Sequence, residues 1–367
     1  MNQSSTVFVG MDVHKESIEI ALADAREVRR FGEIGGDAAS VDRAVRKLRS
    51  AHRSLMFVYE AGPCGFWIYR RLSAQGLSCM VVSPSMTPKR AGERIKTDRR
   101  DATKLARLAR AGELTPIYVP DERDEAMRDL VRAREDALAM QRQARQRLQA
   151  LLLRNEMRYP KKTTWTAAHR RWIAHLKLPQ PTQQIAFEEY VQAIQEASAR
   201  LERLTQALGD ALEHWRWRPV VAALQALRGI RALHAVRIVA ELGDLSRFES
   251  PRQLMGYLGL IPSENSSGPR HRQGSITKAG NSSARRALVE AAHVYRFPAR
   301  VSRGIAQRQS DLDPKLCAIA WKAQLRLCTR FRKLAARGLH RNKVVVAIAR
   351  ELSGFVWAIA REVKPLP

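Results

Sequence analysis

Short apolar runs alternate with amphipathic helical patterns over residues 1 to about 115, and this alternation limits the fold more than any other feature of the chain. The first two strand patterns, 7–12 and 17–22, are close enough in sequence to form a hairpin. Elements that alternate in this way pack as layers, so we predict an α/β domain at the N-terminus. The strand patterns lie at 7–12, 17–22, 55–60 and 78–83, and the helical patterns at 40–50, 65–75 and 99–111.

Four acidic residues lie at the ends of these predicted elements. Asp12 closes the first apolar run, and Glu60 closes the third just before an Ala-Gly-Pro sequence that stops the strand. Asp98 and Asp101 stand three residues apart where a helical pattern begins. Because residues at this spacing share one face of a helix, we expect both carboxylates to be able to bind the same cation.

Clustered carboxylates repel one another unless a cation neutralises them, and hard oxygen ligands suit Mg²⁺ or Mn²⁺. Two such ions can stabilise the attacking and leaving oxygens of a phosphodiester. Taken singly, each acid is better explained as a turn residue or as a favourable charge at a helix N-terminus than as a metal ligand. Their joint placement favours a metal site for cutting nucleic acid.

The composition indicates a polyanionic partner. A formal net charge of +28 over 367 residues is typical of proteins that neutralise phosphates, and the positive surplus is greatest between 261 and 350. The four cysteines are scattered without a metal-binding spacing, so neither a zinc finger nor a disulfide scaffold is indicated. Neither an apolar leader nor a long apolar segment is present, so we expect a cytoplasmic, nucleoid-associated protein without membrane contact.

Two long helical patterns, 122–156 and 182–212, follow this domain with an intervening turn. Apolar residues near a and d spacing predict an antiparallel coiled coil, through which copies of the chain would associate; an intramolecular helical spacer is the alternative. Arg142 and Arg145 lie in a stretch without acids, which is either a solvated face or a surface for a phosphate backbone.

From residue 219 onward the chain is predicted to be helical, with a turn at Gly229 that could present helix amides to a phosphate. A loop rich in Gly, Ser and Asn interrupts it between 259 and 281. The residue types alone favour ordinary loop serines for its Ser266 and Ser267, and phosphate ligands or nucleophiles are the alternatives. The cations expected to contact nucleic acid here are Arg270, Arg272, Lys278, Arg285 and Arg286.

Four spaced motifs together resemble the DEDD-type transposases of bacterial insertion sequences, a family that includes Piv-type DNA invertases and bridge-RNA-guided recombinases. The resemblance covers nearly the whole chain. One departure is Arg231, which follows Gly229-Ile230 where the family usually has a second glycine. The motifs are Gly10-Met11-Asp12-Val13-His14-Lys15, Tyr59-Glu60-Ala61-Gly62, Lys96-Thr97-Asp98-Arg99-Arg100-Asp101-Ala102, and Ser266-Ser267-Gly268 with Gly274, Ile276, Lys278, Gly280 and Asn281.

The resemblance implies a RuvC-like domain of the RNase H fold over 1–118, a coiled-coil hairpin over 119–215 and a mainly helical transposase domain over 216–367. It implies that Asp12, Glu60, Asp98 and Asp101 bind Mg²⁺, and that Ser267 is the recombinase nucleophile, with Ser266 as its neighbouring alternative. Further implications are double-stranded donor and target DNA, a guide (bridge) RNA, and dimers that assemble into a tetramer.

Two other functions are compatible with the residues. A metal-dependent nuclease that resolves Holliday junctions would use the four acids alone, without a covalent intermediate. A structural nucleic-acid-binding protein would not depend on a metal at all, and its activities would be insensitive to EDTA. We expect the transposase to be the correct one of the three.

Overall fold

The computed structural model describes residues 6–88, 97–264 and 272–366, and the chain divides into two compact units. One unit comprises residues 1–120 with 256–282, and the other comprises 121–255 with 283–367. Within the described residues, no helix is long and apolar enough to cross a membrane.

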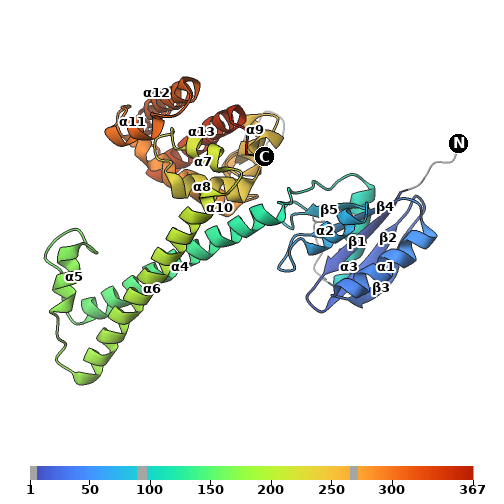
Figure 1. Cartoon of the computed structure of the whole chain (residues 1–367), viewed down its shortest axis with the longest axis horizontal. Coiled ribbons are helices and arrows are strands. Elements are labelled where there is room, and N and C mark those ends of the chain that lie inside the picture. The colour runs from blue at the N-terminus through green and yellow to red at the C-terminus, as the bar shows by residue number, and fades with distance from the viewer. Residues whose placement is uncertain (1–5, 89–96, 265–271, 367) are drawn as a thin grey trace. The chain divides into compact units, whose positions relative to one another are not determined.

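A five-stranded mixed sheet forms the centre of the first unit (Figure 1). The strand order is β3-β2-β1-β4-β5, in which β1, β2 and β3 are antiparallel and β1, β4 and β5 are parallel. This topology confirms the predicted α/β domain and agrees with a RuvC-like fold. The strands are β1 (Val7–Val13), β2 (Ser17–Ala23), β3 (Val28–Gly35), β4 (Leu55–Glu60) and β5 (Ser78–Val82).

Strand β3 was not predicted from the sequence. It lies at an edge of the sheet, and its sequence, Val-Arg-Arg-Phe-Gly-Glu-Ile-Gly, has no fully buried residue. Its apolar residues Phe31 and Ile34 are only partly buried, so the strand lacks the continuous apolar run that marks the central strands.

Three helices cover the two faces of the sheet: α1 (Ala38–Ala51), α2 (Trp67–Ala74) and α3 (Asp98–Arg110). Alternate residues of β1, such as Val9 and Met11, pack in one core with α1 and α2. Strand residues of the opposite face, such as Val58 of β4, pack against Leu105 and Leu108 of α3. Gly10 of β1 also contacts α3. Successive side chains of a strand point to opposite faces, so Asp12, two positions after Gly10, lies on the α3 face.

The second unit begins with two 33-residue helices, α4 (Glu122–Arg154) and α6 (Pro181–Glu213), which run alongside one another (Figure 1). They are antiparallel, because Arg134 of α4 contacts Thr205 of α6 while Gln141, further along α4, contacts Ser198, further back along α6. The two predicted long helices are therefore present. The regular coiled-coil packing expected between them stays a prediction.

A small apolar cluster closes the far end of this helix pair, where α5 (Ala167–Ala174) packs with Leu148, Leu152 and Phe187. At the other end, polar contacts fix α4 to α8 (Ala232–Leu242). Arg128 donates to the carbonyl of Ala240 at 2.9 Å, and Arg132 donates twice to the buried Glu241 at 3.0 Å.

The remainder of the chain is mainly helical, as predicted. A turn at Gly229 separates α7 (Arg218–Leu224) from α8. The φ of Gly229 is +87°, and an added Cβ would lie 2.3 Å from the carbonyl oxygen of Ala291. The elements are α7 (Arg218–Leu224), α8 (Ala232–Leu242), η1 (Leu245–Arg247), α9 (Pro251–Tyr257), β6 (Pro262–Glu264), β7 (Gln273–Ile276), α10 (Ser282–Ala292), η2 (His293–Arg296), α11 (Arg303–Gln309), α12 (Pro314–Ala336) and α13 (Arg341–Glu362).

Candidate metal centre

The four predicted acids lie where the sequence patterns placed them. Asp12 is the penultimate residue of β1, and Glu60 is the last residue of β4. Asp98 opens α3, and Asp101 lies in its first turn. Thr97 caps this helix, because its hydroxyl accepts a hydrogen bond from the amide of Arg100. The cap fixes the start of α3 and therefore the position of both helix acids.

The register of the sheet explains why the two strand acids share a face. Met11 pairs with Tyr59 in the parallel β1 and β4 strands, so the next residues along, Asp12 and Glu60, are neighbours at the ends of those strands. Gly10 of β1 and Val58 of β4 contact α3, and each acid comes two residues after one of them, on the same face of its strand. The two acids therefore lie on the side of the sheet that α3 covers.

A close approach of α3 to the sheet sets the separation between the helix acids and the strand acids. A Cβ added at Gly10 would lie 2.3 Å from the carbonyl oxygen of Ala102 and 2.5 Å from the amide nitrogen of Ala106. Only a residue without a side chain fits at this contact. Gly10 is two residues before Asp12, and Ala102 directly follows Asp101, so this one contact determines how near the two sets of acids come.

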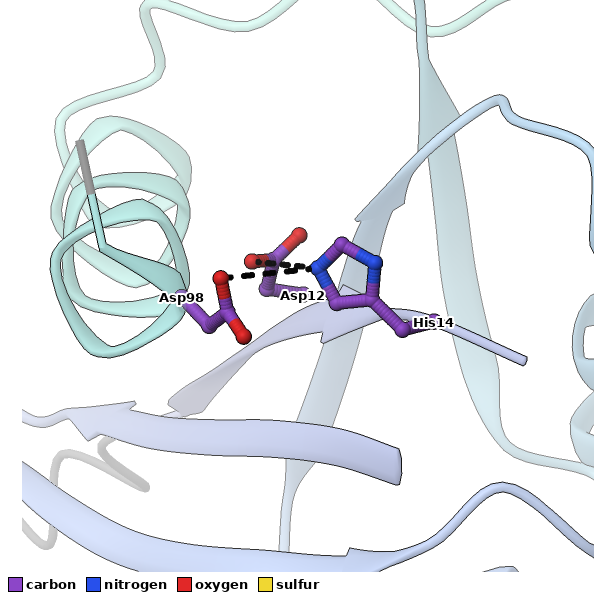
Figure 2. A group of neighbouring side chains, drawn as sticks. All are labelled: Asp12, His14 and Asp98. Atoms are coloured by element: carbon purple, nitrogen blue, oxygen red, sulfur yellow. Dashed lines mark hydrogen bonds and ion pairs between the residues drawn. The ribbon is translucent and has the colours of Figure 1, made fainter. Parts of the chain in front are cut away.

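Asp12 and Asp98 converge with His14, a residue that follows β1 (Figure 2). The imidazole Nε2 lies 3.3 Å from Asp12 Oδ2 and 3.6 Å from Asp98 Oδ1. A ligand atom of each of the three residues lies within 4.8 Å of those of the other two, close enough for one ion to contact all three. The side chain of Asp12 is only 19% exposed, whereas that of Asp98 is 61% exposed.

Burial raises the pKa of Asp12 above its ordinary value, and this is the largest influence on that carboxyl. The neighbouring His14 lowers the pKa, while the charges of Asp101 and Asp98 raise it. Asp12 is thus a partly desolvated carboxylate repelled by two others. A divalent cation removes such a conflict, and the carboxylate oxygens present are the ligands that Mg²⁺ and Mn²⁺ prefer.

The four acids differ in how closely they meet. Asp12 and Asp98 belong to the converging group, and Asp101 is near enough to act on the charge of Asp12. Glu60 is outside the group within 4.8 Å and is placed beside Asp12 by the strand register.

Sequence reasoning did not single out His14 as a member of this cluster. The signal was present, because His14 is two residues beyond Asp12 and so continues the same face of the strand.

A fifth acid on the α3 face was also missed. Glu19 of β2 pairs directly with Asp12 across the antiparallel strands and is almost completely buried. Arg30 of β3 donates two hydrogen bonds to it, at 2.5 and 2.9 Å, and these lower the pKa of the Glu19 carboxyl. Arg30 therefore neutralises the charge of Glu19, whereas Asp12 has no such arginine partner among the described residues.

The serine loop falls largely outside the described residues, which is where Ser266, Ser267 and Arg270 lie. The described parts that flank it are β6 and β7, which form an antiparallel pair. Two predicted nucleic-acid contacts lie here, Arg272 just before β7 and Lys278 just after it, and both are exposed.

The segment after β7 is built from close backbone contacts. A Cβ on Gly280 would lie 1.9 Å from the carbonyl oxygen of Tyr257, and one on Gly259 would lie 2.4 Å from backbone atoms of Ala279. Lys278 adopts a φ of +56°, a conformation that costs a residue with a side chain about 1–2 kcal/mol. Strained backbone held by close packing is common at functional sites.

The other predicted nucleic-acid contacts lie in the second unit. Arg142 and Arg286 are exposed, whereas burial lowers the pKa of the half-buried Arg285. Arg145 stacks on the ring of Trp165, with 4.8 Å between its guanidinium carbon and the ring centroid. Arg145 therefore has a packing role that its sequence position did not reveal.

Comparison with known proteins gives two family matches. A transposase family of the DEDD IS110 type matches residues 9–155, which include all four acids, and the transposase IS116/IS110/IS902 family matches residues 221–305. Both matches agree with the resemblance seen in the sequence motifs.

Individual relatives extend the similarity over nearly the whole chain. A putative transposase y4qE of Sinorhizobium fredii is 45% identical over 97% of this chain and 89% of its own length. The transposase for insertion sequence element IS1533 of Leptospira borgpetersenii is 31% identical over 89% of this chain and 96% of its own. The pilin gene-inverting protein of Moraxella bovis is 24% identical over 76% of this chain and 70% of its own. The chain therefore belongs to the IS116/IS110/IS902 family of insertion-sequence transposases.

Proposed function

We propose that this transposase cuts and rejoins DNA with a metal centre built from Asp12, Glu60, Asp98 and Asp101 and with Ser267 as its nucleophile. The observation that supports the metal centre is the convergence of Asp12 and Asp98 at the edge of the sheet, with Asp101 near enough to raise the pKa of Asp12. The proposal for Ser267 rests on the sequence motif.

The carboxylates of Asp12 and Asp98 are the best placed to hold Mg²⁺ or Mn²⁺, with Asp101 and Glu60 completing the acidic surface. The bound metal would stabilise the negative charge that builds up on a phosphodiester during transfer. Asp12 provides a partly desolvated, fixed oxygen, whereas the exposed Asp98 can adjust to the substrate.

In the proposed strand transfer, the Ser267 hydroxyl loses its proton and its oxygen forms a bond to the phosphorus of the cut strand. The bond from that phosphorus to one neighbouring sugar oxygen breaks, and this oxygen leaves as a hydroxyl after taking up a proton. The DNA phosphate is then an ester of the serine. Attack by a sugar hydroxyl from another strand reverses these steps, releases the serine and restores a phosphodiester without an external source of energy.

Donor and target DNA are the proposed double-stranded substrates, and a guide RNA is proposed to select them. The formal net charge of +28 supports contact with more than one length of nucleic acid, since phosphate neutralisation gives affinity without sequence choice. If base pairing with an RNA reads the DNA, the protein itself requires few base-reading side chains.

We further propose that copies of the chain assemble through the paired α4 and α6 helices, with residues 119–215 as a hairpin between a catalytic domain at 1–118 and a transposase domain at 216–367. Exposed apolar side chains on the pair, Met140, Leu153 and Ile185, support an association surface. Dimers formed in this way would assemble into a tetramer on two DNA duplexes.

A covalent-adduct assay tests the central proposal. Purified protein, RNA transcribed from the element and Mg²⁺ are mixed with labelled DNA of the element junction and separated on a denaturing gel. We expect a labelled protein band that is lost in Ser267→Ala and in Asp12→Asn but kept in Ser266→Ala. Loss in Ser266→Ala alone would transfer the nucleophile to that residue. Cleaved DNA without any adduct would favour the nuclease that resolves Holliday junctions with the four acids and water.

A further inference from the structure

A groove lined mainly by cations lies beside the acidic centre, between α3 and the edge strand β3, and encloses about 650 Å³. Arg100, Lys104 and Arg107 of α3 follow one another at intervals of four and three residues, which places them in one row along the helix. Arg30 of β3 and Arg99 of α3 add two further guanidinium groups.

The orientation of α3 places these cations in the groove. Ala102, Leu105 and Ala106 are buried against the sheet, and this orientation leaves the row of cations on the groove side of α3. Thr97 and Thr103 also line the groove. Lysine and arginine side chains in such a row are groups that contact the phosphates of nucleic acids.

Glu19 compensates only part of the charge of these cations. Glu19 forms an ion pair with Arg30 and acts electrostatically on Arg99. Within the described part of the chain, neither Lys104 nor Arg107 forms an ion pair. Several positive charges in one groove repel one another, and a bound polyanion offsets this repulsion through its attraction to each cation.

The groove also has a useful length. Arg107 and Asp98 are nine residues apart in one helix, which is about 14 Å along its axis at 1.5 Å per residue. Phosphates along one strand are separated by about 3.4 Å in projection, so this distance corresponds to about four nucleotides. A strand in the groove would reach the acids at the start of α3.

We infer that this groove binds the phosphodiester backbone of a nucleic-acid strand and leads that strand to the centre at Asp12 and Asp98. The chemistry recognised is the phosphate row, which DNA and RNA share. The direction of the strand rests on the proposed function of the acids, whereas the binding itself does not.

Amine footprinting of the full-length protein tests the binding. Lys104 and Lys47 are acetylated with a limiting reagent, and their modification is quantified by mass spectrometry with no nucleic acid, with a duplex DNA or with an RNA of the same sequence. Lys47 lies on α1, on the opposite face of the sheet, and is the internal reference. We expect Lys104 to become at least threefold less reactive while Lys47 does not change. Protection by DNA alone or by RNA alone identifies the strand, and equal reactivity of Lys104 in all three samples would overturn the inference.

A matched pair of double variants provides the second readout. Lys104→Gln with Arg107→Gln removes two charges from the groove, and Arg46→Gln with Arg49→Gln removes two exposed charges from α1. We expect the groove variant to lower the dependence of log affinity on log salt by about two, one for each lost phosphate contact, and the α1 variant to leave it unchanged. Identical salt dependence in the two variants would refute the groove.

The outcome for the groove and the outcome for the acids can be separated. If the groove variant recombines DNA normally while Asp12→Asn is inactive, the groove is wrong and the proposed centre stands. If Lys104 is protected but Asp12→Asn remains active, the groove stands and the proposed centre fails.

Discussion

Asp12 and Glu19 are directly paired across β1 and β2, yet their carboxyl groups have opposite shifts in pKa. Glu19 accepts two hydrogen bonds from Arg30, which lower its pKa, whereas burial raises the pKa of Asp12. One acid of the pair is neutralised permanently by the protein. The other retains an electrostatic cost that a cation can remove.

Asp12→Asn should abolish metal-dependent strand cleavage without unfolding the first unit. The amide keeps the shape of the side chain but removes the charge that a metal needs, and it also removes the repulsion from Asp98 and Asp101. We expect a melting temperature equal to or above that of the wild type, and a loss of the stabilisation that added Mg²⁺ gives the wild type. Thermal unfolding with and without Mg²⁺ measures both effects, and undiminished cleavage by Asp12→Asn would contradict the assignment.

Glu19→Gln should have the opposite profile. Its carboxylate is committed to Arg30, so we expect cleavage to continue and the melting temperature to fall, because the guanidinium loses a charged partner. Thermal unfolding and the cleavage assay, run beside Asp12→Asn, provide the comparison. Complete loss of cleavage in a folded Glu19→Gln protein would mean that Glu19 belongs to the reacting centre.

Gly10→Ala should move α3 away from the sheet and impair cleavage. The added methyl group would meet backbone atoms of Ala102 and Ala106 at 2.3 and 2.5 Å, which no side-chain rotation relieves. We expect a loss of about 1–3 kcal/mol in the free energy of unfolding, as for other overpacked cores. The control is Gly209→Ala within α6, where no atom lies within 4 Å of the added methyl group. That change should stabilise its helix by about 0.5–1 kcal/mol, and denaturant unfolding measures both variants.

Acid unfolding of the first unit should depend on the ion pair between Asp42 of α1 and Arg71 of α2. Hydrogen bonds from Arg71 lower the pKa of Asp42 from 3.8 to about 2. A depressed pKa gives stability that is complete above the unfolded value of 3.8 and is lost as the pH falls towards 2. Urea unfolding should therefore show wild type more stable than Asp42→Asn at pH 5, with a difference that shrinks between pH 4 and pH 2. A constant difference over this range would exclude the ion pair as its source.

Local patterns in the sequence were sufficient to predict most of the first unit. The apolar runs ending at Asp12 and Glu60 identified two central strands, and the spacing of Asp98 and Asp101 identified the start of α3. These elements bury continuous apolar faces, and burial is what leaves a periodic signal. Strand β3 buries no residue fully, and its sequence left no such signal.

Features that depend on contacts between distant residues could not be predicted in the same way. The ion pair between Glu19 and Arg30 requires the register of β2 and β3, which includes an irregularity between Ile20 and Ala21. The need for glycine at position 10 becomes apparent only once α3 is placed on the sheet. The cationic groove likewise combines β3, which was missed, with a face of α3 that the helix pattern alone did not assign to any partner.

The contact between Gly10 and α3 divides the acidic centre into a rigid half and a compliant half. Backbone touching backbone leaves the strand and the helix no freedom to shift independently, so Asp12 is preset before any ion arrives. Asp98, at the exposed tip of the same helix, retains the freedom of its own side chain. The side chain of Asp98 should therefore be the one that adapts to ions of different radius and to the changing charge on phosphorus. The distance between β1 and α3 should stay constant throughout the reaction.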